Sequence, residues 1–363
     1  MLGKNFCDFG GIDVLCVLDK CFVVGGCPLR VQLAAVFRGR QVVSVCQGDQ
    51  FLPFFGHMVI VTAEVSHRAG ALMLNERAIN DALDQFHAEG YTIVRGFLPE
   101  DELVELQRKT AELREIALEH PVTYRHGNLT YEILPEEHFG KRYVIQAYWF
   151  AWADAYFDKF RSNPRYLQLL EPLIGNNVKQ VTQQIHWKPP GARLTGYRFH
   201  QDLRFRESRE SYEDVVRDTV TMGLAIDRAT PENGCLKIVP RSHTMGYLGL
   251  SDNGDGQIMK GLTQDDELVQ VGIDPSRVMD VVLEPGDLVV WGLMTVHGSL
   301  PNESIHERAF AISSYVRGET SQRGEWTFKD GKPQMLGETP QLCKNEKLFT
   351  NLEPHYDATK WFL

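Results

Sequence analysis

The chain has 363 residues, a net charge of −10 at pH 7 and 43% hydrophobic residues. This length allows one large domain or two modest ones, and a charged fraction of 24% is typical of globular proteins rather than disordered or fibrous ones. The acidic balance argues against a nucleic-acid-binding protein that relies on a basic surface. No segment approaches the roughly 18–20 uninterrupted apolar residues of a membrane span, which excludes an integral membrane protein.

The cysteines are concentrated near the start of the chain. Five of the seven lie in the first 72 residues: Cys7, Cys16, Cys21, Cys27 and Cys46. A disulfide or zinc module is one interpretation, but the number is odd and no Cys-x-x-Cys pair occurs. The segment has no basic region or cleavage site of a secretory signal, so we expect a cytoplasmic protein. We expect residues 1–72 to be a poorly structured or non-native extension, with the working domain over residues 73–363.

Two amphipathic helices with a strand between them are predicted directly after Met73. Ile79, Leu83 and Phe86 form one apolar stripe, and Gly90 can end that helix. The segment from 91 to 97 indicates a short strand, because it is rich in β-branched residues. A second helix begins near Pro99, with acidic residues in its first turn. Its predicted apolar stripe consists of Leu103, Leu106, Thr110, Leu113 and Ile116.

Short β-like segments separated by Gly, Pro and Asn turns dominate from about residue 141 onward. We expect strands at Val178–Trp187, Thr219–Ile226, Cys235–Val239, Val281–Leu283, Asp287–Trp291 and Ala309–Val316. This pattern predicts a mainly β fold with flanking α-helices, in which an antiparallel sandwich or barrel packs against the N-terminal helices. An aromatic segment at 148–157 favours helix packing, with an apolar substrate pocket as the alternative.

A candidate metal site emerges from two separate motifs. His200 and Asp202 are one residue apart, and in a strand their side chains would lie on one face, about 7 Å from each other. His297 follows about 95 residues later, after a Pro-Gly turn and an apolar strand. Taken alone, a salt-bridged His-x-Asp pair or a core histidine is the more common interpretation of each motif. Together, two histidines and one carboxylate can hold a metal and leave three positions open, as in non-haem Fe(II) oxygenases.

Basic and polar residues near this site suggest an anion-binding function. Arg308 begins an apolar strand, and an arginine there can hold a dicarboxylate by bidentate, charge-assisted hydrogen bonds. Ser299 can add a hydroxyl to the same carboxylate. His186 alternates with Thr182 and Gln184 on one strand face, for which an ordinary polar face is the alternative. Two arginines that follow Asp202 either meet an anionic substrate group or are salt-bridged: Arg204 and Arg206.

These motifs resemble the phytanoyl-CoA dioxygenase family of Fe(II)- and 2-oxoglutarate-dependent oxygenases, over roughly residues 76–320. The resemblance rests on the segments 199–202, 231–236, 239–243 and 297–299, with Asn302 and Arg308. It implies a double-stranded β-helix (jelly-roll, cupin-like) core. It also implies that the iron ligands are His200, Asp202 and His297, that Arg308 and Ser299 bind 2-oxoglutarate, and that His186 lies near this cosubstrate. His243 is expected to be structural and His306 to be exposed.

The resemblance implies a dioxygenase that uses Fe(II), 2-oxoglutarate and O2 to hydroxylate a small-molecule metabolite or natural-product intermediate, with release of succinate and CO2. Asp202 argues against halogenation, because related halogenases have a small residue in its place. One alternative is a cupin-like non-oxidative metalloenzyme, an isomerase or hydrolase, which would have no use for Arg308. The other is a non-catalytic ligand-binding member of the family. The sequence leaves open the substrate, the oligomeric state and the choice between hydroxylation, desaturation, epoxidation and cyclisation.

Overall fold

The computed structural model describes residues 73–134, 140–191, 195–206, 209–251, 265–337 and 351–357, together with the course of four earlier strands. The chain divides into two compact units, Met1–Gly70 and Ala71–Leu363. The first contains β1 (Asn5–Phe9), β2 (Ile12–Val24), β3 (Cys27–Val36) and β4 (Arg40–Cys46), an antiparallel sheet in the order β1-β2-β3-β4. The expectation that residues 1–72 form a poorly structured or non-native extension stays a prediction.

The second unit is built on two antiparallel sheets. The larger has eleven strands, nine of them in the order β19-β6-β7-β8-β9-β16-β11-β14-β5. In chain order these are β5 (Tyr91–Val94), β6 (Tyr124–His126), β7 (Leu129–Leu134), β8 (Tyr143–Tyr148), β9 (Val178–Lys188), β11 (Thr219–Ala225), β14 (Leu288–Gly292), β16 (Arg308–Arg317) and β19 (His355–Tyr356). β17 (Glu325–Lys329) pairs with β9 and with β18 (Lys332–Pro333). The smaller sheet has the order β10-β15-β12-β13, from β10 (Tyr197–His200), β12 (Leu236–Ile238), β13 (Met279–Val281) and β15 (His297–Ser299).

Apolar side chains from both sheets pack against one another and form an inner core. Ile238 and Val281 come from the smaller sheet, while Val289, Trp291 and Phe310 come from the larger one. Alternate residues of a strand point to opposite faces, so the neighbours of these residues face the other way. The antiparallel sandwich predicted from the short strands is therefore confirmed, and its eight central strands β9 to β16 enclose the interior of the unit.

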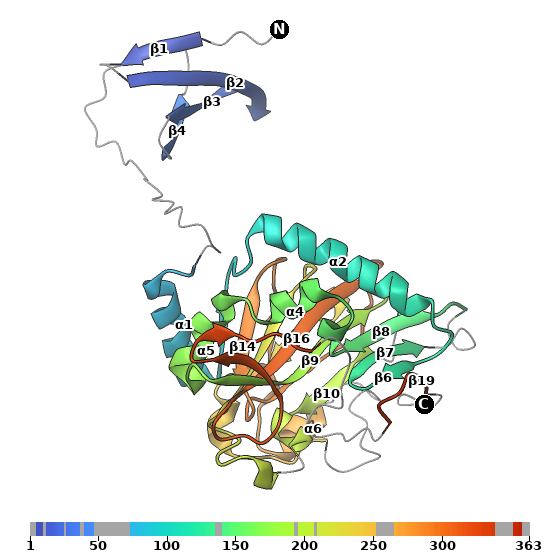
Figure 1. The fold of residues 1–363 in the computed structure, drawn as a ribbon. Helices are drawn as coiled ribbons and strands as arrows, with labels where there is room; N and C mark the ends of the chain where they lie inside the picture. Colours follow the sequence, from blue (N-terminus) through green and yellow to red (C-terminus); the bar gives the residue numbers. More distant parts are fainter. Residues whose placement is uncertain are drawn as a thin grey trace. The chain divides into compact units, whose positions relative to one another are not determined.

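Helices cover the outer face of the larger sheet. They are α1 (Glu76–Glu89), α2 (Glu100–Leu118), α4 (Ala155–Arg161) and α5 (Pro164–Ile174), and the short α6 (Asp265–Gln270) follows later in the chain. α2 packs against β7 and β8 (Figure 1), and α5 packs against β11. α1 ends at Gly90, whose φ of 82° is the left-handed conformation that the sequence predicts for a C-terminal glycine. Within the described ranges no helix is long and apolar enough to cross a membrane.

The buried stripe of α2 differs from the predicted stripe in its last turn. Leu106, Thr110 and Leu113 are buried as expected, but the fourth buried residue is Ala117. Ile116 is 46% exposed. Spacings of three and four residues both place side chains on one helix face, so hydrophobicity alone selected the wrong member of this pair. The small Ala117 allows the helix to approach the sheet at this end.

Most predicted strands are present, with ends shifted by one or two residues. The strands β6 and β7 were not predicted. The sequence of β7, Leu-Thr-Tyr-Glu-Ile-Leu, alternates apolar and polar residues over most of its length as a strand does, and all six residues are buried. The aromatic segment at 148–157 lies in a second apolar core, between the larger sheet and the helices, which we call the outer core. There Phe150 and Phe157 pack edge to face with ring centroids 5.0 Å apart. This is the helix-packing interpretation of that segment, from η1 (Phe150–Trp152) into α4.

Truncating the buried and the exposed member of the α2 stripe should give very different losses of stability. Leu113→Ala removes a fully buried side chain and should lower the free energy of unfolding by about 2–5 kcal/mol. Ile116→Ala is the matched control and should cost less than about 1 kcal/mol, because Ile116 is half exposed in the native state. Urea unfolding followed by circular dichroism measures both. Equal losses would contradict this orientation of α2.

Candidate metal centre

Two histidines and an aspartate from three elements meet inside the second unit. His200 ends β10, His297 begins β15, and Asp202 begins the 3-10 helix η3 (Asp202–Phe205). Asp202 Oδ1 is 3.7 Å from His200 Nε2 and 3.5 Å from His297 Nε2. One ligand atom from each of the three residues lies within 4.8 Å of the other two, and all three side chains are largely buried. The sequence motifs therefore converge on one point.

The expected geometry of the His-x-Asp motif is corrected in one respect. The strand does not continue through Asp202, because β10 ends at His200 and a 3-10 turn follows. Gln201 is still extended, with φ −116° and ψ 133°, so the side chains on either side of it share one direction. The buried Gln201 side chain donates to the carbonyl groups of Gly246 and Met294 and fixes the turn.

Hydrogen bonds to backbone carbonyl groups set the tautomer of both histidines. Nδ1 of His200 donates to the carbonyl of Arg198 at 2.7 Å, and Nδ1 of His297 donates to the carbonyl of Thr295 at 2.9 Å. A carbonyl group can only accept, so the proton of each neutral ring lies on Nδ1. Nε2 of each ring then presents a lone pair toward Asp202, as a metal-binding histidine requires.

The two oxygens of Asp202 have different surroundings. Oδ2 accepts hydrogen bonds from Trp291 Nε1 at 3.1 Å and from Thr221 Oγ at 3.2 Å. Trp291 and Thr221 are cross-strand partners on β14 and β11. Oδ1 faces the two histidines instead. The carboxylate is therefore oriented by the larger sheet, and it offers one oxygen to the point where the three side chains meet.

Charge and burial shift the pKa values of the three side chains in different directions. Burial, reinforced by His297, lowers the pKa of His200 to about 3. Burial opposes the charged form of His297 too, but the Asp202 carboxylate outweighs it and raises the pKa of His297. For Asp202, the neighbouring histidines overcome the effect of burial and lower its pKa. An ionised carboxylate and neutral imidazoles together form a suitable set of donors for a divalent metal.

A support that the sequence did not suggest holds His297 in place. The Ser242 hydroxyl donates to the carbonyl of Val239 at 2.7 Å and accepts from the backbone N–H of Val296 at 2.8 Å. Ser242 is fully buried. It belongs to the same turn as His243, which packs against Gly90 and takes no part in the triad, in keeping with its expected structural role. His306 is exposed, as predicted.

A second cluster, which we call the basic cluster, consists of Arg308, Lys188 and Ser299. Arg308 and Lys188 are directly opposite each other on β16 and β9, and both are buried. Lys188 Nζ donates to Ser299 Oγ at 2.7 Å. Like charges at directly opposed positions are unfavourable, and burial, reinforced by Arg308, lowers the pKa of Lys188 well below its usual range. Neither cation forms an ion pair with an acidic side chain of the described residues.

The carbonyl group of Gly234 accepts hydrogen bonds from both cations. Arg308 Nη2 and Lys188 Nζ, the latter at 3.1 Å, donate to it. Gly234 has a φ of 73°, and a Cβ atom there would lie 2.3 Å from the carbonyl oxygen of Leu300. Glycine is required at this position, both for the left-handed backbone and for the close approach. Gly234, in the segment 231–236 on which the family resemblance partly rests, thus positions the basic cluster.

His186 lies two residues before Lys188 on β9, inside a buried polar network. Tyr197 Oη and Gln146 Nε2 contact His186 Nδ1 at 2.7 and 2.9 Å. Burial lowers the pKa of His186 to about 3 and raises that of Tyr197, so both groups are neutral. The structure thus gives His186 defined polar partners, whereas its predicted contact with the cosubstrate stays a prediction.

The residues present match what iron and 2-oxoglutarate need. The Nε2 atoms and Oδ1 are separated by distances close to those between ligands of one metal ion. Arg308 Nε is buried and has no hydrogen-bond acceptor in the described part of the chain. An anion with two acceptor oxygens would provide one. Ser299 is two residues after His297 in the same strand, so their side chains share a face, about 7 Å apart by strand geometry.

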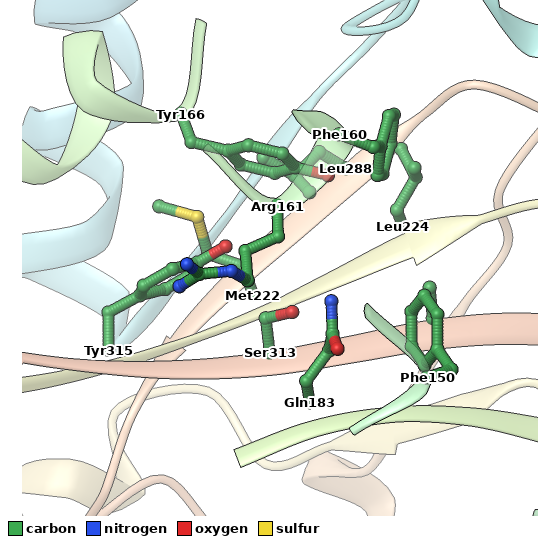
Figure 2. A pocket seen from close by; sticks show the side chains of 11 residues that line it. Phe150, Phe160, Arg161, Tyr166, Gln183, Met222, Leu224, Leu288, Ser313 and Tyr315 are labelled. Carbon is green, nitrogen blue, oxygen red and sulfur yellow. The ribbon is translucent and has the colours of Figure 1, made fainter. Parts of the chain in front are cut away.

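A separate cavity lies outside this centre, under α4 and α5. Figure 2 shows Arg161, Tyr166, Gln183 and Tyr315 around it, together with apolar side chains. None of its lining residues belongs to the triad or to the basic cluster. Arg161 is satisfied there, because its guanidinium donates to Asp158 at 2.9 Å and to Thr327 at 2.9 Å. The cavity belongs to the packing of the outer core rather than to the candidate metal centre.

Two antiparallel sheets around two histidines and one aspartate define a jelly-roll protein with a candidate metal centre. Residues 86–310, more than half of the chain, match the family Phytanoyl-CoA dioxygenase (PhyH). The chain belongs to this family, as the sequence motifs predicted. The crystal structure of EctD from S. alaskensis with bound Fe has a TM-score of 0.50 at 17% identity, and the match covers 76% of this chain and 90% of that one. This likeness confirms the predicted fold.

Curated relatives match over shorter segments. The methylphosphonate hydroxylase of Gimesia maris is 32% identical over 143 residues, which are 39% of this chain and 47% of that protein. The probable alpha-ketoglutarate-dependent hypophosphite dioxygenase of Stutzerimonas stutzeri is 25% identical over 169 residues, 45% of this chain and 55% of that one. The chain thus spans about half the length of the curated relatives it matches.

Adding a methyl group at Gly234 should destabilise the protein more than the same change at a glycine in open space. Gly191 has a similar φ of 68° but no atom within 4 Å of an added Cβ, so Gly191→Ala should cost about 1–2 kcal/mol from its backbone conformation alone. Gly234→Ala should cost about 1–3 kcal/mol more, because the methyl group displaces the backbone of Leu300. Chemical unfolding of both variants measures the difference. Equal losses would show that the close approach does not matter.

Proposed function

We propose that this protein is an Fe(II)- and 2-oxoglutarate-dependent dioxygenase that hydroxylates a small molecule. The observation that carries the proposal is the convergence of His200, Asp202 and His297 beside the basic cluster. A metal site alone would suit many reactions. A metal site beside two buried cations that form no ion pair with a described acidic residue suits a metal that works together with a carboxylate cosubstrate.

Iron would be held by Nε2 of His200, Nε2 of His297 and Oδ1 of Asp202. The protein prepares these donors, since backbone carbonyl groups keep the protons on Nδ1 and Trp291 and Thr221 occupy Oδ2. Such outer hydrogen bonds orient the ligands and tune their basicity. Three protein ligands leave room on the metal for a chelating cosubstrate and for dioxygen.

The distal carboxylate of 2-oxoglutarate would be held by Arg308, Lys188 and Ser299. Arg308 Nε has no acceptor in the described part of the chain. Ser299 Oγ already accepts from Lys188, so its hydroxyl proton is available to a carboxylate. The Gly234 carbonyl orients both cations. Binding a dianion here also relieves the repulsion between Arg308 and Lys188, which face each other across the β9–β16 pair.

Bound iron and cosubstrate supply the oxidising chemistry. The substrate C–H bond, dioxygen and 2-oxoglutarate give the hydroxylated product, succinate and carbon dioxide. The residues of this chain contribute position and exclusion of water: the triad is largely buried, and the apolar side chains of Trp291 and Phe310 border the interior. A buried site strengthens charge interactions and protects reactive species from side reactions.

The substrate is proposed only as a small molecule. Relatives carry the names methylphosphonate hydroxylase, hypophosphite dioxygenase and 2-aminoethylphosphonate dioxygenase, which all refer to small phosphorus compounds. A small-molecule substrate agrees with the buried position of the triad. We also propose that the enzyme acts in the cytoplasm, without a nucleic-acid or membrane partner, and these expectations rest on the sequence alone.

The basic cluster argues against the two alternatives drawn from the sequence. A cupin-like isomerase or hydrolase that works without 2-oxoglutarate has no need for Arg308 and Lys188 facing each other without an acidic partner. A member that only binds a ligand has no need to keep both histidine Nε2 atoms and Asp202 Oδ1 oriented to one point. The dioxygenase uses both features.

Removing a triad ligand should abolish iron-dependent succinate release. His200→Ala and Asp202→Ala each delete one donor and should lower the rate at least about 100-fold, because the remaining two ligands hold Fe(II) weakly. His306→Ala is the matched control, since this histidine is exposed, and its activity should equal that of the native chain. The assay measures succinate from 2-oxoglutarate under air with added Fe(II). Activity that survives both ligand changes would refute the triad.

Removing either cation of the basic cluster should weaken 2-oxoglutarate binding. Each of Arg308→Ala and Lys188→Met deletes a charge-assisted hydrogen bond, so the KM for 2-oxoglutarate should rise about 10- to 100-fold. Lys332→Met is the control at an exposed lysine and should leave KM unchanged. Steady-state kinetics at saturating Fe(II) measures the effect. An unchanged KM in both variants would place the cosubstrate elsewhere.

A further inference from the structure

Five arginines are buried in the described residues, and they fall into two groups. Three form ion pairs with acidic side chains: Arg125 with Asp357, Arg161 with Asp158 and Arg165 with Glu102, at 2.8 to 2.9 Å. The other two, Arg206 and Arg308, have no acidic partner among these residues. Arg308 is accounted for by the proposed cosubstrate. Arg206 is 4% exposed. The neighbouring His297 and His200 and, less strongly, the Arg206 charge overcome burial and lower the pKa of Asp202, but no carboxylate of the described residues forms an ion pair with Arg206.

Arg206 lies beside the candidate metal centre. It directly follows η3, the short helix that begins with Asp202. Its Nη2 donates to Ser314 Oγ at 3.0 Å, and its Nε is buried and has no acceptor among the residues that the structure describes. Burying a guanidinium is unfavourable unless an anion or a full set of acceptors compensates. A single hydroxyl acceptor does not complete this set.

A directional chain of hydrogen bonds joins Arg206 to the Asp202 carboxylate. Ser314 and Thr221 are cross-strand partners, with their hydroxyl oxygens 3.1 Å apart, and Thr221 donates to Asp202 Oδ2. Since an arginine can only donate and an ionised carboxylate can only accept, every hydrogen bond runs from Arg206 toward Asp202. The chain places the guanidinium three hydrogen bonds from the metal ligand, on the inward face of β11 and β16.

The two unpaired arginines lie toward opposite ends of one strand. Arg308 begins β16, and Ser314, the partner of Arg206, is six residues further along the same face, about 20 Å away by strand geometry. A cosubstrate held by Arg308 therefore does not reach Arg206. The charge of Arg206 favours the ionised form of Asp202, after the larger effect of the two histidines. Orientation of Asp202 does not need Arg206, because Trp291 and Thr221 already donate to Oδ2, and the interaction with Asp202 supplies no acceptor for Arg206 Nε.

We propose that Arg206, together with Ser314, binds an anionic group of the substrate and holds the substrate beside the metal, on the side away from Arg308. This inference rests on the proposed function, because it takes the bound anion to be the substrate of the proposed dioxygenase. The anionic group is a carboxylate or a phosphoryl-type oxyanion, since both offer a guanidinium two acceptor oxygens. The substrate class is thus a small organic anion, and the part to be oxidised extends from this group toward the triad.

Calorimetric titration of the full chain, loaded with Fe(II) and 2-oxoglutarate without oxygen, tests the proposal. The probes are methylphosphonate, acetate and the uncharged acetamide. At least one anion should bind more tightly than acetamide, and the anion that binds identifies the oxyanion class. Arg206→Gln should weaken binding of that anion at least tenfold, and Arg206→Lys should weaken it less, because the charge is kept. Arg217→Gln removes an exposed arginine of the same loop region and should change nothing.

Two outcomes would overturn the proposal. In one, neither anion binds the native chain better than acetamide. In the other, Arg206→Gln leaves anion binding intact and instead weakens Fe(II) binding, which would make Arg206 a positioning residue for Asp202. Separate titrations with Fe(II) and 2-oxoglutarate keep this test distinct from that of the proposed function. If neither of them binds, the dioxygenase proposal fails, while the anion titration of the native and Arg206→Gln chains still decides whether Arg206 forms an anion site.

Discussion

The pairing of Asp202 Oδ2 with Trp291 and Thr221 is the interaction on which the candidate centre depends. These two donors belong to neighbouring strands of the larger sheet, whereas His200 and His297 belong to the smaller one. The carboxylate therefore joins the two layers of the sandwich at one point. With Oδ2 occupied, Oδ1 has only one direction left, toward both Nε2 atoms. The hydrophobic packing between the sheets fixes the separation at which this convergence is possible.

The sequence predicted the parts of the site that lie in short linear motifs. The spacing of three residues suggests one metal site: His200, Asp202 and His297. Arg308 follows His297 by eleven residues. Lys188 was not predicted as a site residue, although it directly precedes a Pro-Pro-Gly turn. Its role depends on its pairing opposite Arg308, which lies 120 residues later in the chain. Ser242 was missed for a similar reason, since its hydroxyl supports a backbone N–H more than 50 residues away. No local pattern contains such information.

For the fold as well, local sequence predicted some elements and tertiary packing determined the others. Strands with apolar alternation and helices with clear end signals were predicted closely, and Gly90 is an example in which a single residue set a helix end. The strand β7 alternates apolar and polar residues, Leu-Thr-Tyr-Glu-Ile-Leu, which predicts one solvent-exposed face, yet all six residues are buried. Ile116 and Ala117 differ by one position, and only tertiary packing decides which of them faces the sheet. Burial on both faces and close competition within a stripe are properties of the folded chain, not of local sequence.

Among the described residues Arg206 and Arg308 have no ion-pair partner, and anion binding at these arginines, as proposed, would couple the stability of the protein to the anions around it. In most buried ion pairs the compensating charge is part of the chain and is present from folding onward. At the proposed cosubstrate and substrate sites the compensating charge would come from solution, so bound anions would stabilise the folded form by mass action, as any ligand does that binds only that form. The stability of the folded chain would then rise with the concentration of its own reactants.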